Sequence, residues 1–122
     1  MVDDDDRFTR ALTAILAQGR GHTWSMFEEM QVYFRVGPKM IDKKLVTCVQ
    51  LANLSLHRDW QHKGCFTRLV ACISQVTDLP IYLEQVVNTE FLDALMARHG
   101  WKPARTHDGQ VWDLWLPKEN AQ

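Results

Sequence analysis

The spacing of apolar residues along the chain predicts helices as well as strands. After the acidic run 3–6, apolar residues recur at intervals that suit one face of a helix, and they are Phe8, Leu12, Ile15 and Leu16. Acidic side chains favour the positive end of a helix, and Gly19 with Gly21 favours its termination. The first element is therefore expected to be a helix of about four turns.

Extended segments are predicted next. Residues 31–36 are rich in β-branched and aromatic side chains, and Gly37-Pro38 is expected to end that strand. A longer run, 45–56, alternates between two faces and predicts the next strand, with a bulge or splay near its end. Because 23–29 shows no clear pattern, one helix and one strand are expected before the long strand.

The second half of the chain predicts alternating strands and helices. The expected elements are a helix at 66–76, a strand at 79–87, a helix through 91–96 that stops at Gly100, and strands at 101–105 and 110–116. A helix between two strands of one sheet predicts that those strands run parallel. Asp108-Gly109 predicts the turn of a closing β-hairpin.

Length and composition indicate one globular domain. A chain of 122 residues with 46% apolar and 24% charged residues is long enough for a single core. The formal charge of −1 gives no overall attraction to nucleic acid or to an anionic membrane, so neither is expected as a partner. The apolar runs are too short to span a bilayer and the N-terminus is acidic, so a cytoplasmic location is expected.

The cysteines and histidines do not predict a metal site. Cys48, Cys65 and Cys72 form no C-x-x-C pair, and the five histidines are scattered along the sequence. The three thiols are therefore expected to be reduced, and no metal is expected.

The loop before the second helix has the properties of an anion site. The amides of a first helical turn lack partners within the helix and point outward with the positive end of its dipole, which suits a phosphate group. Gly64 allows a ligand to approach the backbone, and Lys63 can contact the same anion. We expect a pyrophosphate to fit this loop.

The segment 54–69 resembles the cofactor motif of the GNAT superfamily of N-acetyltransferases. In that family the fourth strand leads through Arg/Gln-x-x-Gly-x-Gly/Ala into a helix. Gln61 stands at the first position, Gly64 at the central glycine and Phe66 at the last small position. A second stretch, 81–101, is similar to the family's fifth strand, the following helix and its terminal Gly-Phe.

The resemblance implies an α/β (α+β) fold with a mixed, mostly antiparallel sheet, splayed central strands and flanking helices. The whole chain, 1–122, would form one domain, in which 45–116 binds the cofactor. The part before it, 1–44, would be a shortened acceptor-side half. Chains of this kind look similar to acetyltransferase-like proteins encoded by bacteriophages.

The cofactor implied by the resemblance is acetyl-CoA. The end of the fourth strand would bind the pantetheine arm through its backbone, and a backbone N–H near Leu56 would polarise the acetyl carbonyl. The residues expected to bind the cofactor are Leu54, Leu56, Gln61, His62, Lys63, Gly64, Cys65, Phe66 and Asn88.

Acetyl transfer to an amine needs a base for the ammonium and an acid for the leaving thiolate. His57 and Glu84 are the candidates for the base, with Glu28 and Glu29 as alternatives that precede the first predicted strand. Family members often place a tyrosine acid four residues before the Gly-Phe, where this chain has Met96. Tyr82 is the substitute candidate.

Two ligand-binding functions remain open on the sequence, beside a structural domain with no ligand, in which protein or water would occupy the amides of 61–66. The first is an N-acetyltransferase that uses acetyl-CoA to acetylate an amine of a small molecule or protein. The alternative is a GNAT-like protein with weak or no catalysis that binds and modulates a partner enzyme, which Met96, Phe66 and the short first half favour. A second copy or a partner enzyme would complete the acceptor side.

Overall fold

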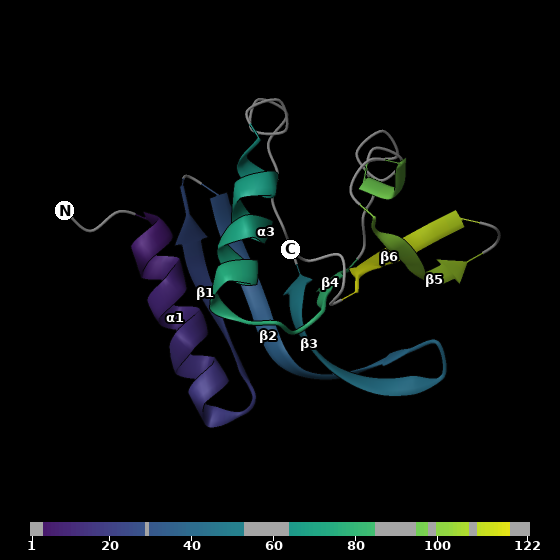
Figure 1. Ribbon diagram of the computed structural model, residues 1–122, viewed down its shortest axis with the longest axis horizontal. Helices are drawn as coiled ribbons and strands as arrows, with labels where there is room; N and C mark the ends of the chain where they lie inside the picture. Colours follow the sequence, from purple (N-terminus) through teal and green to yellow (C-terminus); the bar gives the residue numbers. More distant parts are fainter. Residues whose placement is uncertain are drawn as a thin grey trace.

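A computed structural model shows one six-stranded sheet and two long helices (Figure 1). It describes residues 4–28, 30–52, 64–84, 95–97, 100–107 and 110–117. The helices are α1 (Asp4–Gln18) and α3 (Cys65–Val76), and residues 95–97 are also helical. The strands are β1 (Gly21–Phe27), β2 (Met30–Ile41), β3 (Lys44–Ala52), β4 (Ile81–Leu83), β5 (Lys102–His107) and β6 (Gln110–Leu116).

The strand order of the sheet is β1-β2-β3-β4-β6-β5. Within the described strands, β3 and β4 form the one parallel pair, and all other neighbours are antiparallel. This confirms the predicted mixed, mostly antiparallel sheet. The parallel pair is joined by α3, as the strand–helix–strand order predicts.

The first helix forms where its pattern predicts. Phe8, Leu12 and Ile15 of α1 are buried in the core. The helix ends at Gly19, which has φ of 87° and whose N–H donates to the carbonyl oxygen of Leu16 at 3.1 Å. Glycine adopts this left-handed conformation without the Cβ clash of other residues.

The first half of the chain contains one strand more than its sequence predicts. Gly21–Phe27 forms β1 and pairs with β2 along its whole length, although no clear pattern predicted a strand there. The side of β1 that α1 covers carries Gly21, Thr23 and Ser25 before Phe27, and a Cβ at Gly21 would lie 3.4 Å from Ile15 of α1. Small side chains on the covered side hide the alternation that predicts a strand.

The prediction that the strand at 31–36 ends at Gly37-Pro38 is wrong. β2 runs on to Ile41, with Pro38 opposite Thr47 of β3. β1 pairs with β2 only as far as Val36, so Pro38 has a neighbouring strand on one side alone. A proline is tolerated there because its missing N–H costs no hydrogen bond on the free side.

The central strands are shorter in the described residues than predicted. β3 covers Lys44–Ala52 and β4 covers Ile81–Leu83, so residues 79, 80 and 84 of the predicted strand 79–87 are not in β4, while 53–56 and 85–87 lie outside the described residues. The bulge or splay predicted near the end of the strand at 45–56 falls mainly on these residues outside the described ranges. The closing hairpin of β5 and β6 forms as predicted, and its turn, 108–109, also lies outside.

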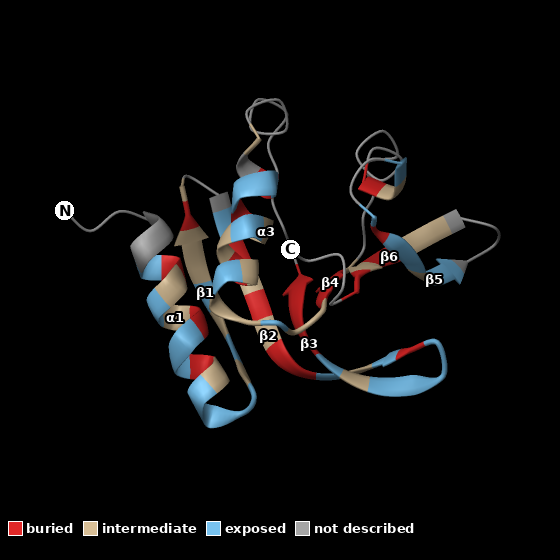
Figure 2. Cartoon of the chain, in the orientation of Figure 1, coloured by how far each residue is buried: buried red, intermediate tan, exposed pale blue. Residues whose placement is uncertain are grey.

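Buried residues gather on parts of β2, β3 and β4 and along one side of α1 (Figure 2), and the two faces of the sheet differ in character. One face, the covered face, packs against α1 and α3 through a single apolar cluster. Its strand residues are Phe27, Val32, Phe34, Val36, Val49, Leu51, Ile81, Leu83, Leu114 and Leu116. The other face, the open face, carries Tyr33, Arg35, Lys39, Cys48, Gln50, Tyr82, Glu84 and Asp113. No described helix contributes to the small apolar cluster on the open face.

Candidate functional site

The start of α3 lies at the end of the sheet where β3 and β4 finish (Figure 1). The N-cap residue is Gly64, with φ of 72° and ψ of 17°, and it has no side chain to accept from the first-turn amides. The first helical bond runs from the Arg68 N–H to the Gly64 carbonyl oxygen at 3.0 Å. The first-turn amides of α3 therefore receive no cap from a side chain at position 64.

The start of α3 carries a cation and no acidic residue of its own. The first turn of α3 carries no acidic residue, and Arg68 lies in that turn. A Cβ at Gly64 would lie 3.4 Å from the Arg68 guanidinium, so the glycine and the arginine are close neighbours. The positive end of the helix dipole and the guanidinium therefore act on the same space.

Arg68 is also held by the turn that follows β1. Its Nε and Nη2 donate to the two carboxylate oxygens of Glu28 at 2.6 and 2.7 Å. Glu28 has φ of 57°, a conformation uncommon for a residue with a side chain. This two-point contact ties the β1–β2 turn to the start of α3, so Glu28, named in the sequence as an alternative base, serves an ion pair here.

Phe66 points into the core. Its side chain is 5% exposed, and its ring packs against Trp101 with centroids 5.8 Å apart. Phe66 is larger than the residue that the motif has at this position, but its ring therefore does not cover the solvent-facing side of the helix start. Cys65 begins α3 beside it.

Most of the other predicted cofactor residues belong to the parts of the chain that the structure does not describe. Leu54, Leu56, Gln61, His62, Lys63 and Asn88, together with the candidate bases His57 and Glu29, lie outside the described residues. Their assignments stay predictions.

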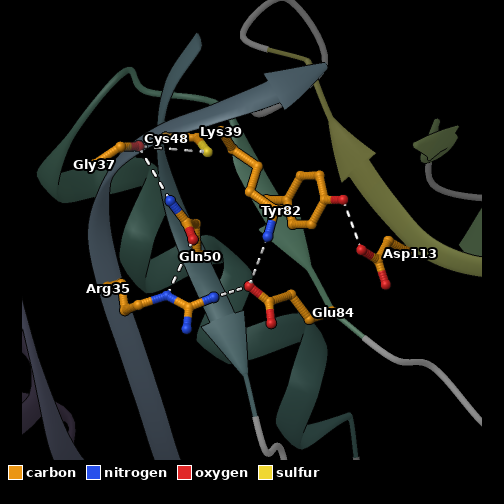
Figure 3. A network of polar contacts seen from close by, with 8 residues as sticks. All are labelled: Arg35, Gly37, Lys39, Cys48, Gln50, Tyr82, Glu84 and Asp113. Atoms are coloured by element: carbon orange, nitrogen blue, oxygen red, sulfur yellow. Dashed lines mark hydrogen bonds and ion pairs between the residues drawn. The ribbon is translucent and has the colours of Figure 1, made fainter. Parts of the chain in front are cut away.

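The candidates Glu84 and Tyr82 lie on the open face, on alternate positions along and just after β4 (Figure 3). The N–H of Glu84 donates to the Leu51 carbonyl oxygen at 3.0 Å, which extends the parallel ladder by one residue. Glu84 forms an ion pair with Arg35, and Lys39 Nζ donates to the same Oε1 at 3.2 Å. Two cations from β2 thus share one carboxylate.

Gln50 fixes Arg35 in this position. The Gln50 side chain is 5% exposed, and its Nε2 donates to the Gly37 carbonyl oxygen at 3.1 Å. Its Oε1 then accepts from Arg35 Nε at 3.1 Å. A buried amide with defined partners gives the guanidinium one preferred orientation.

Tyr82 is bound to a buried acid. Its hydroxyl donates to Asp113 Oδ2 at 2.6 Å, and Asp113 is 1% exposed. Burial, followed by this hydrogen bond and the Asp113 charge, raises the pKa of Tyr82 well above its usual value. Lys39 Nζ lies 5.0 Å from the centre of the Tyr82 ring, which links the tyrosine to the Glu84 cluster.

Cys48 lies in the same region, where burial keeps its thiol protonated. It is fully buried, and that burial raises the pKa of its thiol to about 11, so the thiolate is scarce at neutral pH. Within the described ranges, no three His, Cys, Asp or Glu side chains gather as metal ligands.

The sequence predicted Tyr82 and Glu84 but missed their partners. Arg35 and Lys39 share one face of β2, and the predicted strand end at Gly37 removed Lys39 from that face. Extending the period-two pattern through Gly37-Pro38 would have found both cations. The Tyr82–Asp113 contact depends on β4 pairing with β6, which no local pattern indicates.

Comparison with protein-family models, with curated proteins and with solved structures finds no match to this chain. None of the helices in the described ranges has the length and apolar character that a membrane crossing requires. Function is therefore inferred from the fold and from the side chains described above.

Proposed function

We propose that this chain is a compact GNAT-type domain that binds acetyl-CoA and transfers its acetyl group to an amine. The observation that carries the proposal is the β3–α3–β4 unit, in which a glycine in the left-handed conformation opens α3. This is the order of elements in which the resemblance places the cofactor. The β5–β6 hairpin beside β4 agrees with the family's last two strands.

The helix start supports pyrophosphate binding. The helix amides and the dipole favour negative charge next to Gly64, and the first turn of α3 itself contributes no carboxylate, while the Arg68 charge beside it is paired with Glu28. Gln61, His62 and Lys63 precede this point directly in the sequence and would form the rest of the phosphate loop. The parallel strands β3 and β4 end beside it, and ligands of sheets with parallel strands commonly bind at the carboxyl ends of those strands.

Two of the groups considered for the chemical step already serve other contacts. Glu84 is bound to two cations, and the Tyr82 proton is donated to Asp113. Histidine ordinarily titrates near neutral pH, so His57 is the base that we favour. The acid that protonates the CoA thiolate is left unassigned.

These same contacts favour the second candidate function. A Glu84 held by cations, a Tyr82 held by an acid and a methionine at position 96 together suit a domain that binds acetyl-CoA with little turnover and modulates a partner enzyme. The two candidates share the cofactor site and differ in acetyl transfer. Release of CoA thiol from acetyl-CoA, measured with a panel of small amines and lysine peptides, separates them.

The test of the cofactor site is calorimetric titration with acetyl-CoA and CoA. Wild type should bind both saturably. Gly64→Asp should weaken binding at least about tenfold more than Gly64→Asn, because the two side chains have the same size and both tolerate positive φ, but only Asp repels a phosphate.

Stability supplies the control for this pair of variants. A carboxylate near a helix N-terminus favours the helix, so Gly64→Asp should be at least as stable to urea as Gly64→Asn. Opposite effects on binding and stability would identify a phosphate site. Equal CoA affinities for the two variants, or no binding by wild type, would overturn the assignment.

A further inference from the structure

The two edges of the sheet are built differently. β5 forms one edge and carries Lys102, Pro103 and Arg105, with register irregularities on either side of Arg105. Charged side chains, proline and bulges are the usual means by which proteins prevent another strand from pairing with an edge. The β5 edge is therefore protected.

The opposite edge, β1, has none of these features. Gly21–Phe27 contains no Lys, Arg, Asp, Glu or Pro, and its register with β2 is continuous. Among the described strands, β1 has a partner on one side only. Trp24, at the centre of β1, is 55% exposed and lies against Tyr33 with ring centroids 5.2 Å apart.

We propose that β1 pairs antiparallel with β1 of a second copy of this chain, so that the two sheets become continuous. The two-fold axis would pass through Trp24, because that register alone pairs all of Gly21–Phe27 with its counterpart. Trp24 would then lie beside Trp24 of the second copy, and cross-strand aromatic pairs stabilise antiparallel strands.

The charges that flank β1 favour a second copy over an unrelated strand. In this register Arg20 lies opposite Glu28 of the second copy, and the reverse pair forms by symmetry. The Glu28 carboxylate already accepts from Arg68, and a carboxylate has further lone pairs for a second guanidinium. Thr23 would lie opposite Ser25, another favourable cross-strand pair.

The helix next to this edge leaves room for a second copy. Arg7 of α1 lines a hollow together with Trp24 and Ser25, so this side of α1 borders β1. Two turns further along that side, Ala14 is short and exposed, while Ala11 between them packs against the core. Two α1 helices can approach closely where such small side chains meet, so strand pairing and helix packing are compatible.

Sedimentation velocity of the full chain over a wide concentration range tests this interface. Wild type should associate to twice the chain mass of 14.2 kDa. Trp24→Lys should weaken association by about tenfold or more, because it places two like charges directly opposite each other. The matched variant Leu45→Lys changes another exposed apolar residue, 69% exposed on β3, and should associate as wild type does.

The charge pair gives a second, independent test. Arg20→Glu should weaken association, and added salt should restore part of it, because the substitution sets a carboxylate at position 20 against Glu28 of the second copy. Lys44→Glu makes the same charge change away from β1 and should have no effect. A wild type that stays monomeric, or a dimer that Trp24→Lys leaves unchanged, would overturn the proposal.

This interface does not depend on the cofactor. Gly64→Asp should lose CoA binding and still associate, because Gly64 lies at α3 and not at the β1 edge. A dimer without CoA binding would leave the interface standing and remove the acetyltransferase assignment. CoA binding by a chain that stays monomeric would overturn the interface and leave the acetyltransferase assignment standing.

Discussion

The covered and open faces of the sheet are made by alternate residues of the same strands. On β3, Val49 and Leu51 enter the apolar core, while Cys48 and Gln50 point to the other side, where Gln50 joins the polar network. The covered face has apolar side chains from both helices, whereas the open face has ion pairs and buried hydrogen bonds. Adjacent residues of one strand therefore have different roles, since one packs in the core that stabilises the fold and the next contributes to the polar candidate site.

Substitutions on the two faces should therefore affect different properties of the protein. Covered-face residues should control folding with little direct effect on a ligand. Open-face residues should have smaller effects on folding, and those effects should depend on charge and pH.

The largest effect is expected on the covered face. Leu51→Ala should lower the free energy of unfolding by about 2–5 kcal/mol, because the side chain is 0% exposed and its loss leaves a cavity. Leu45→Ala is the matched control, since Leu45 lies on the same strand but is 69% exposed, and it should change stability by no more than about 0.5 kcal/mol. Urea denaturation measures both, and equal losses would contradict the contrast between buried and exposed positions.

The elements that the sequence predicts well are those with a local pattern. The apolar side of α1, the helical spacing in α3 and the Asp108-Gly109 turn signal each depend on residues close in the chain. β1 was missed because Gly21, Thr23 and Ser25 on its covered side are small, so the side chains do not alternate clearly between apolar and polar.

The candidate site was only partly predictable for a different reason. Arg35 reaches Glu84 across the intervening strand β3, and that contact requires the registers of two strand pairs. Registers follow from packing of the whole sheet, which a sequence pattern does not specify. The sequence could therefore name Glu84 and Tyr82 as polar residues of one strand, but not the cations or the acid that bind them.

The second-largest effect is expected in the pH dependence of stability, through Cys48 on the open face. Burial raises the pKa of Cys48 from 9.0 to about 11, so the unfolded chain loses this proton first as pH rises. The stabilising contribution is complete below pH 9.0 and is lost by about pH 11, which amounts to roughly 3 kcal/mol.

Cys48→Ala and Cys48→Val should both flatten this alkaline decline, whatever their absolute stabilities. Urea denaturation at a series of pH values from neutral to about 10 measures the slope. An unchanged slope in both variants would show that the Cys48 thiol is not responsible.

A smaller effect is expected from the buried tyrosine. Tyr82→Phe removes the donor to Asp113 and should cost about 1–2 kcal/mol, because a buried carboxylate loses a short hydrogen bond. Tyr33→Phe is the matched control on the same face, where the ring is only partly buried, and should cost less than about 0.5 kcal/mol. The acetyl-transfer rate of Tyr82→Phe also bears on its role, since a general acid would lose about 100-fold or more.

The smallest effect on stability is expected at Glu84. Glu84→Gln removes the ion pairs with Arg35 and Lys39, but these side chains are partly exposed and Arg35 keeps its bond to Gln50. The cost should be about 1 kcal/mol or less and should shrink further in high salt. A double-mutant cycle with Lys39→Gln isolates the second ion pair.

The acetyl-transfer rate of Glu84→Gln tests the role of this residue more directly than its stability does. Because its carboxylate already serves two cations, we expect acetyl transfer to fall less than about tenfold, with unchanged CoA affinity. His57→Gln should then cause the larger loss, on the order of 100-fold or more, if His57 is the base. The reverse order would assign proton removal to Glu84. It would also mean that Arg35 and Lys39 release the carboxylate when an acceptor binds, which would place the acceptor on the open face.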